Sequence, residues 1–234
     1  MNAYLRDVFN VNPAGLRNTL MDSGFDSLED LVVMTDEDVA RACSIIRKSQ
    51  ADHRNITPML ETRLKKLSTA ATYKYMVQRD LGNYADLTMA NLDAIYNWKR
   101  QLDSDPDLDS VKKFSSSGNK KHLFEAVESY LQVKKGKTTF PIWHVSRTEP
   151  VPAVADDPGF LEPTIQEELR RRGRHDGHFW QGDNRLVFNL VRHITQGTIA
   201  WGEVKNFERR GNGHAALQHM ERRYLGEDTK SKLM

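Results

Sequence analysis

The stretch His175-Asp-Gly-His178 carries the residue types best suited to chemistry in this chain. Two imidazoles and a carboxylate could hold a metal ion, as in a metal-dependent hydrolase. A metal site also needs a third and a fourth ligand at a defined spacing, and the neighbouring sequence does not supply them. His-Asp-Gly is also ordinary turn chemistry, because Asp and Gly both favour turns. We therefore interpret the stretch as a turn entering a helix near Phe179 and Trp180, and keep the hydrolase as an alternative.

Other motifs fail at a required position. Gly136-Lys137-Thr138 resembles the end of a phosphate-binding loop, but Leu131 stands where that motif needs a glycine. The acidic run 103–110 resembles the start of a calcium loop, but Leu108 stands where the sharp turn needs a glycine. Cys43 falls on the apolar face of a predicted helix, so we expect a buried, unreactive thiol. The sequence therefore predicts no catalytic residue, no cofactor and no metal ligand.

Two basic stretches could contact a phosphate backbone without sequence specificity. Their residues are Lys112, Lys113, Lys120, Lys121, Lys134, Lys135 and Lys137 in the middle of the chain, and Arg170, Arg171, Arg172 and Arg174 further on. The alternative is a solvated helix face with basic last turns, which the helix dipole favours. Neither stretch is interleaved with aromatic residues, as a base-stacking platform would be.

The totals limit the class of protein. The chain has 234 residues, enough for one or two domains, and 38% of them are hydrophobic, enough for a core. Its 34 basic and 32 acidic residues give a net charge of only +2, which disfavours a surface devoted to nucleic acid. A single cysteine indicates a reducing compartment, and no apolar run approaches the ~20 residues of a membrane span. We expect a cytoplasmic protein with no membrane partner.

The elements that must position these residues are all predicted to be helices, apart from one arm. Helix starts are clear at Asn12-Pro13, at Thr35 with three following acids, and at Thr57-Pro58, whose helix we expect to run to about Asp80. Further helices are predicted over 87–103, 119–135, 164–172, 183–197, 198–210 and 212–226, with an extended arm or strand over 138–147 and a Pro-rich linker over 149–163.

The first 80 residues resemble SAM-like domains. The resemblance rests on the order of several short helices before a long one. It also rests on the phrase from Leu20 to Val39, which reads helix, Gly-aromatic turn, Leu-x-x-Leu, then Thr-Asp-Glu-Asp. It implies a SAM-like helical bundle over 1–80 with a long fifth helix. A helical middle region with a basic patch and the arm would follow over 81–148.

The segment 164–234 resembles the Gag-like capsid proteins of Copia-type LTR retrotransposons. The matching motifs are His175-Asp-Gly177, Trp180-x-x-Asp183-Asn-x-x-Val187-Phe, Gly197-Thr, Phe207-x-Arg-x-Gly211, Gly213-x-Ala-Ala216-Leu and Tyr224-x-Gly226. The resemblance implies a self-associating domain that packages RNA. It also implies that Trp180, Phe188, Trp201, Phe207, Leu217 and Tyr224 hold the domain together or form its contact surface.

Many Gag proteins end in a Cys-x-x-Cys-x4-His-x4-Cys zinc knuckle, for which this chain lacks the cysteines. Either the capsid-like segment is truncated, or RNA capture uses the basic stretches. The leading hypothesis is thus a non-enzymatic, Gag-like structural protein that associates with itself and with RNA, and has no small-molecule substrate. The second hypothesis is a SAM-like adaptor or a non-specific nucleic-acid-binding module, and the third is the hydrolase.

Overall fold

The computed structural model describes residues 1–48, 56–102, 106–147 and 164–226. In these ranges the regular elements are helices, and the β pairing is a single isolated bridge between Lys135 and Pro141. The all-α fold class is therefore confirmed. The chain divides into two compact units: unit 1 comprises Met1–Gln101 and Pro152–Glu168, and unit 2 comprises Leu102–Val151 and Leu169–Met234.

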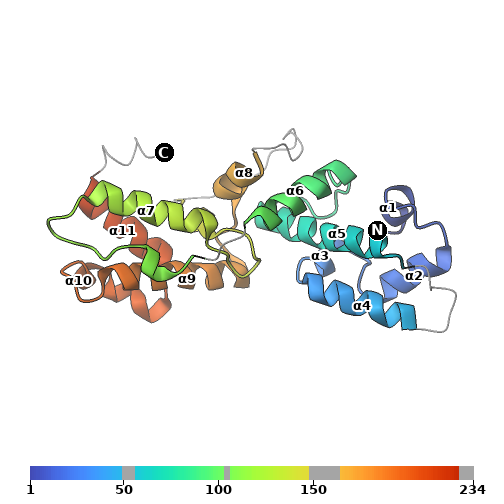
Figure 1. The fold of residues 1–234 in the computed structure, drawn as a ribbon, viewed down its shortest axis with the longest axis horizontal. Coiled ribbons are helices and arrows are strands. Elements are labelled where there is room, and N and C mark those ends of the chain that lie inside the picture. Colours follow the sequence, from blue (N-terminus) through green and yellow to red (C-terminus); the bar gives the residue numbers. More distant parts are fainter. Residues whose placement is uncertain (49–55, 103–105, 148–163, 227–234) are drawn as a thin grey trace. The chain divides into compact units, whose positions relative to one another are not determined.

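The elements follow one another as short and medium helices (Figure 1). Those before residue 102 are α1 (Asn2–Asp7), α2 (Ala14–Asp22), α3 (Leu28–Leu31), α4 (Asp36–Lys48), α5 (Pro58–Met76) and α6 (Met89–Gln101). Those after it are the 3₁₀ helix η1 (Leu108–Ser110), α7 (Lys120–Val133), the 3₁₀ helix η2 (Ile142–Ser146), α8 (Thr164–Arg172), α9 (Gly177–Thr195), α10 (Trp201–Val204), the 3₁₀ helix η3 (Lys205–Arg210) and α11 (Gly213–Leu225).

The predicted helix starts at Thr35 and Thr57 are confirmed by their capping bonds, whereas α2 has Pro13 as its N-cap and no side-chain capping bond. The Thr35 hydroxyl accepts from the backbone N–H of Asp38 at 3.2 Å, and the Asp38 carboxylate accepts from the Thr35 N–H at 3.0 Å. This reciprocal capping box satisfies two N–H groups that the first turn of α4 leaves unpaired. Thr57 also caps its helix, α5, since its hydroxyl accepts from the N–H of Leu60 at 3.1 Å.

Unit 1 is built around α5, which packs against α3, α4 and α6 (Figure 1). One apolar face of α5 is fully buried, with Leu64, Leu67 and Ala71 at 0% exposure. The helix ends at Met76, earlier than the predicted Asp80, because Gln78 adopts a left-handed backbone with φ of 58°. The helices predicted from residue 12 onward are present and α1 is an additional one, while nothing in the structure establishes the SAM-like arrangement.

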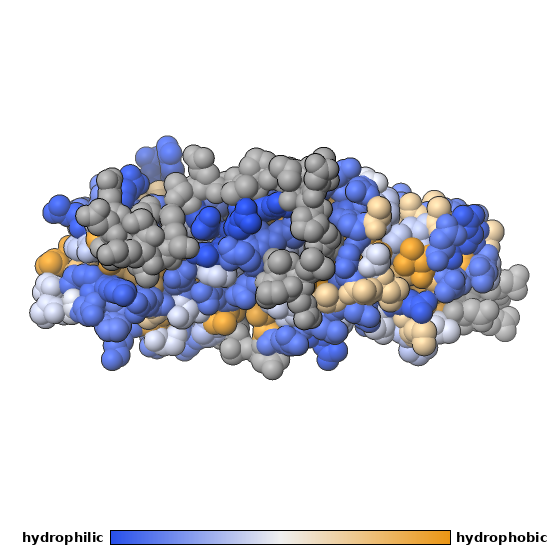
Figure 2. Space-filling view, turned by 90° about the horizontal axis from the view of Figure 1, so that it is seen from above, coloured by the Kyte–Doolittle hydropathy of each residue, from blue (hydrophilic) through white to orange (hydrophobic). Residues whose placement is uncertain are grey.

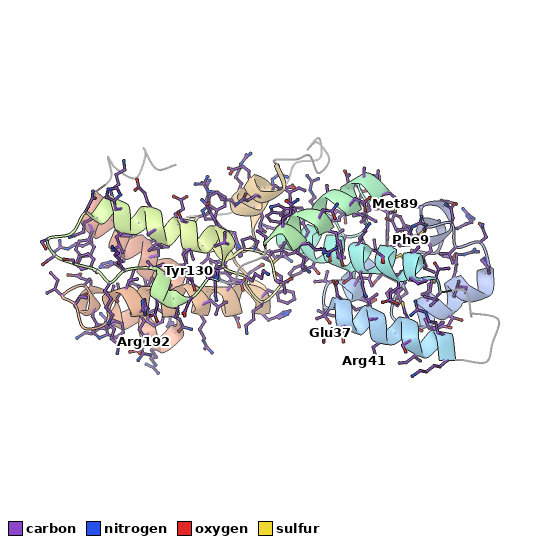
Figure 3. The ribbon with its side chains drawn as sticks, in the orientation of Figure 1. Phe9, Glu37, Arg41, Met89, Tyr130 and Arg192 are labelled. Carbon is purple, nitrogen blue, oxygen red and sulfur yellow. The ribbon has the colours of Figure 1, made fainter. Side chains whose placement is uncertain are left out.

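Unit 2 packs α7, η2, α9, α10 and α11 around a core of its own. Tyr130 points from α7 into this core, and it is 4% exposed (Figure 3). The helices α9 and α11 approach closely at Gly213, where a Cβ atom would overlap the backbone of Asn184 and Phe188. Glycine is required there because only a hydrogen atom fits between the two helices.

Three predictions about organisation are corrected. Residues 142–146 form the 3₁₀ helix η2 and not part of an extended arm, because Thr139, with φ of 64°, turns the chain before it. The helix α6 lies in the predicted middle region but packs on α5, so it belongs to unit 1. Residues of α7 and η2 join those of α9 and α11 in one unit, so the predicted middle region 81–148 is divided between the two units. The linker 149–163 lies outside the described residues.

Candidate functional site around the buried His144–Asp183 pair

Two ionisable side chains face each other inside unit 2. His144 comes from η2 and Asp183 from α9, and both side chains are 0% exposed. The His144 Nε2 atom lies 3.9 Å from the Asp183 Oδ2 atom, which is beyond hydrogen-bond distance. Neither of these two atoms has a hydrogen-bond partner. Buried polar atoms in proteins nearly always have a hydrogen-bond partner. Two polar atoms that face each other without one therefore mark this pair as a candidate functional site.

The other polar atoms of the pair are held by the backbone. Asp183 Oδ1 accepts a hydrogen bond from the Lys137 backbone N–H at 2.7 Å. His144 Nδ1 lies 3.4 Å from the Pro141 carbonyl oxygen, which can only accept. Gly173 lies directly against His144, and a Cβ there would overlap the His144 side chain. The turn before η2 and the residue after α8 therefore fix the two side chains in place.

Burial shifts both ionisation equilibria towards the uncharged forms. Desolvation lowers the pKa of His144 to about 3, and the neighbouring His175 adds to this effect, while the Pro141 carbonyl opposes it. Desolvation raises the pKa of Asp183 to about 6, against the bond from the Lys137 N–H and the Lys137 charge. The cause in each case is that a charge loses its hydration inside the protein.

Three rings pack next to the pair. His175 stacks on Trp180 with ring centroids 4.1 Å apart and an interplanar angle of 16°. His214 from α11 meets His175 edge to face at 5.1 Å. His175 Nε2 donates to the His144 carbonyl at 3.0 Å, because a carbonyl oxygen only accepts. Burial lowers the pKa of His175, so its neutral form is favoured.

The same segment, η2, receives two further bonds from α11. His214 Nδ1 donates to the Val145 carbonyl at 2.7 Å, and Gln218 Nε2 donates to the Ser146 carbonyl at 2.7 Å. Together with the His175 bond, three successive carbonyls of η2 are held by side chains. The imidazoles of this region thus act as structural donors to a 3₁₀ segment.

The two histidines of the alternative metal-site interpretation do not converge in the structure. His175 faces the buried pair, whereas His178 is exposed and lies beside Phe179 with ring centroids 3.9 Å apart. Among the described residues no group of three His, Cys, Asp or Glu side chains is arranged to hold a metal ion. The prediction of a turn leading into a helix is confirmed, since α9 begins at Gly177 with Asp176 as its N-cap.

The predicted basic residues of the middle stretch separate into two groups. Lys112, Lys113, Lys121 and Lys137 are exposed. Lys120 instead holds the loop before α7 together, because its ammonium donates to the carbonyls of Ser116 at 2.8 Å and Gly118 at 2.9 Å. Lys134 and Lys135 are half-buried, and the Lys134 ammonium lies 6.0 Å from the ring centre of Tyr130.

The arginine stretch is mostly engaged within the protein. Arg170 lies over the Trp143 ring at 4.4 Å, Arg172 is 8% exposed, and Arg174 pairs with Asp176 at 2.9 Å. Arg171 is exposed. The sequence prediction missed a further basic face on α9 and η3, made of Arg185, Arg192, Lys205, Arg209 and Arg210, which are all exposed. Arg192 points outward from α9 and pairs with Glu208 at 3.2 Å (Figure 3).

The predicted packing residues take two different positions. Phe188 and Leu217 are core residues at 3% and 1% exposure. Trp180, Trp201, Phe207 and Tyr224 are half-buried and lie at the edge of the same core. We call the half-buried apolar residues packed against this core the unit 2 rim: Leu108, Leu123, Trp180, Leu186, Trp201, Phe207, Tyr224 and Leu225.

A cavity of about 70 Å³ lies between α7 and α11. Its lining includes Phe124, Val127, Leu131 and Leu217, with Glu128 and Arg170 among the polar residues. Small-molecule sites usually enclose about 300–1,000 Å³, so this cavity is too small for a nucleotide or a similar ligand. None of the helices in the described ranges is both long enough and apolar enough to cross a membrane.

The sequence did contain one signal for the buried pair. Asp183 lies on the same helical face of α9 as the apolar residues Val187, Leu190 and Ile194. This spacing predicts that the Asp183 carboxylate is buried. Its partner could not be found in this way, because His144 is distant in the sequence and lies in a segment predicted to be extended.

Comparison with protein-family models, with curated proteins and with solved structures finds no match to this chain. The resemblance to SAM-like and Gag-like proteins therefore stays a prediction from the sequence motifs.

Proposed function

We propose that this chain is a non-enzymatic, Gag-like structural protein that self-associates through unit 2 and takes up RNA through its exposed basic residues. The observation that carries the proposal is the unit 2 rim, in which large apolar side chains remain half-exposed around a completed core. Tyr, Trp and Phe are enriched at the centres of protein interfaces because they bury much area at little entropic cost. Four of the five aromatic residues predicted for assembly occur in this rim: Trp180, Trp201, Phe207 and Tyr224.

Ile199 extends the apolar surface beside the rim. It precedes the buried Ala200 and the rim residue Trp201, and it is 73% exposed. On the surface seen in Figure 2, hydrophobic residues lie singly or in small groups among hydrophilic ones. Scattered apolar residues need no explanation, whereas an exposed isoleucine next to the half-exposed Trp201 of the rim suits a contact surface.

Sedimentation of the intact chain over a wide range of concentrations tests self-association. We expect the average mass to rise with concentration, and Ile199→Asp to shift that rise to higher concentration because it places a charge in the interface. Ile45→Asp is the matched control, since Ile45 is also exposed, at 64%, but lies on α4 in unit 1. A strictly monomeric parent chain, or equal effects of the two substitutions, would count against the proposal.

Nucleic-acid binding is favoured by a separate observation, the exposed basic face on α9 and η3. A phosphate backbone is held by Arg and Lys side chains that are free to reach it, and Arg185, Lys205, Arg209 and Arg210 are exposed. Charge reversal at Arg209 and Arg210 is expected to weaken binding to single-stranded RNA of any sequence. Charge reversal at Arg172, which is buried, would act through folding instead. RNA affinity that is unchanged by the first pair of substitutions would refute this role for the face.

A further inference from the structure

His144 Nε2 and Asp183 Oδ2 are buried without a hydrogen-bond partner, and the packing around them does not explain why. Both side chains are fully buried, and their bare atoms point at each other across 3.9 Å. Leaving a buried polar atom unsatisfied is costly, and two such atoms side by side double that cost. A donor and an acceptor at this position would satisfy each other after an approach of about 1 Å, to normal hydrogen-bond length.

We propose that His144 Nε2 and Asp183 Oδ2 form a buried proton-binding site that closes on taking up one proton, drawing η2 against α9. The proton makes one atom a donor and leaves the other an acceptor. It forms an O–H on the Asp183 carboxyl facing the Nε2 lone pair, or an N–H on His144 facing the carboxylate. Each arrangement gives one hydrogen bond where the unprotonated pair in this tautomer has none.

The neighbouring atoms fix which nitrogen of His144 is free. Pro141 presents a carbonyl to Nδ1, so the hydrogen of the neutral ring is favoured on Nδ1. Nε2 is then a bare acceptor facing the bare carboxylate oxygen, and two acceptors repel. Without the extra proton the pair stays apart, which agrees with the 3.9 Å separation.

Few other ionisable groups face the pair. Lys137 approaches Asp183 from the turn before η2, through its backbone N–H and its charge. His175 approaches His144 from the connection between α8 and α9, with ring centroids 6.5 Å apart. His214 from α11 lies one ring further, against His175, and the Asp176 carboxylate acts on His175. The bonds of His175 and His214 to η2 use N–H donors, so they persist when those rings are protonated.

The sign of the pH effect differs between the two partners. The pKa of Asp183 is raised from 3.8 to about 6, so its contribution to stability is complete below pH 3.8 and is lost as the pH rises through 6. The pKa of His144 is lowered from 6.5 to about 3, so its contribution is complete above pH 6.5 and is lost as the pH falls towards 3. Between pH 6 and 4 the folded protein binds one proton at this pair, on Asp183. The unfolded chain also binds one proton in this range, on His144. The two effects therefore nearly cancel in the parent chain.

Substituting one partner exposes the effect of the other. Relative to the parent, the unfolding constant of Asp183→Asn should rise as the pH falls from 6.5 to 4, by up to about tenfold per pH unit. Relative to the parent, the unfolding constant of His144→Gln should instead fall as the pH falls from 6 to 4, also by up to about tenfold per pH unit. His178→Gln is the control, because His178 is exposed, and it should follow the parent. Both substitutions following the parent, or both sloping the same way, would overturn the proposal.

NMR titration of the parent chain tests the proposal even if a substituted chain fails to fold. The carboxyl ¹³C shift of Asp183 and the Nε2 ¹⁵N shift of His144 should titrate together, at a pH well above that of an ordinary aspartate. A carboxyl that stays ionised down to the ordinary aspartate range, or two signals that titrate separately, would show that no proton is shared.

Discussion

The buried charge of Lys74 is compensated by two partners. In unit 1 the Lys74 side chain is 0% exposed, and its ammonium donates to the Asp86 carboxylate at 2.7 Å and to the Asn83 carbonyl. The ion pair and the carbonyl together replace the hydration that the ammonium loses. A charge in such a position depends on each of its partners, because the surrounding protein offers no water in their place.

We therefore expect Asp86→Asn to destabilise the protein by about 3–5 kcal/mol, because it leaves a buried ammonium without its counter-charge. The control is Asp93→Asn, which breaks the ion pair with Lys66 at the surface, where Asp93 is 46% exposed. That change should cost less than about 1 kcal/mol. Urea unfolding of both variants measures the difference, and similar losses of stability would show that the Lys74 pair is solvated.

Cys43 is expected to be inert in the folded protein. It is 0% exposed on α4, and burial, with a smaller effect of the Glu61 charge, raises the pKa of its thiol to about 11. Only the thiolate attacks alkylating reagents, so modification at neutral pH should wait for unfolding. Labelling with iodoacetamide followed by mass spectrometry checks this, with urea-unfolded protein as the positive control. Rapid labelling of the native chain would contradict the buried position.

At the scale of the elements, packing between helices depends on a few small residues. Gly213 lets α11 approach α9 closely, and Asn184 of α9 then caps the first turn of α11, since its carboxamide oxygen accepts from the His214 N–H at 2.7 Å. The close crossing and the capping bond rely on the same short distance between the helices. A larger side chain at position 213 would therefore disturb both.

We expect Gly213→Ala to destabilise unit 2 by about 1–3 kcal/mol or more, because the new methyl group meets backbone atoms that cannot move aside freely. Gly202→Ala is a matched control in the same unit. Gly202 lies in α10 with open space around it, so alanine there should be neutral or stabilise by about 0.5–1 kcal/mol through its helix propensity. Thermal unfolding of both variants gives the comparison, and a neutral Gly213→Ala would mean that the helices can separate without loss.

Local signals predicted the helices well and the connections poorly. Caps such as Thr35 and Thr57 mark helix starts through hydrogen bonds within a few residues, so the sequence shows them directly. The η2 segment was predicted as part of an extended arm or strand. It is a 3₁₀ helix held by His175, His214 and Gln218. Those bonds come from residues distant in sequence, which periodicity and propensity do not register.

At the scale of the whole molecule, the near balance of charge limits how the chain can use electrostatics. With 34 basic and 32 acidic residues, any attraction to a polyanion must come from local faces such as that on α9 and η3. The proposed self-association through the apolar unit 2 rim would have a different origin, the removal of apolar surface from water. The two parts of the proposed function should therefore respond differently to salt.

We expect the affinity for single-stranded RNA to fall steeply as salt rises, with a log–log slope of about −0.7 for each phosphate contact. Self-association should be unchanged or strengthened over the same range, because salt screens charges but does not weaken apolar burial. Fluorescence anisotropy with labelled RNA and sedimentation of the protein alone measure the two responses. If the oligomers dissociate with salt in parallel with RNA release, ion pairs and not the rim would hold the chains together. If RNA binding is insensitive to salt, the basic face is not its site.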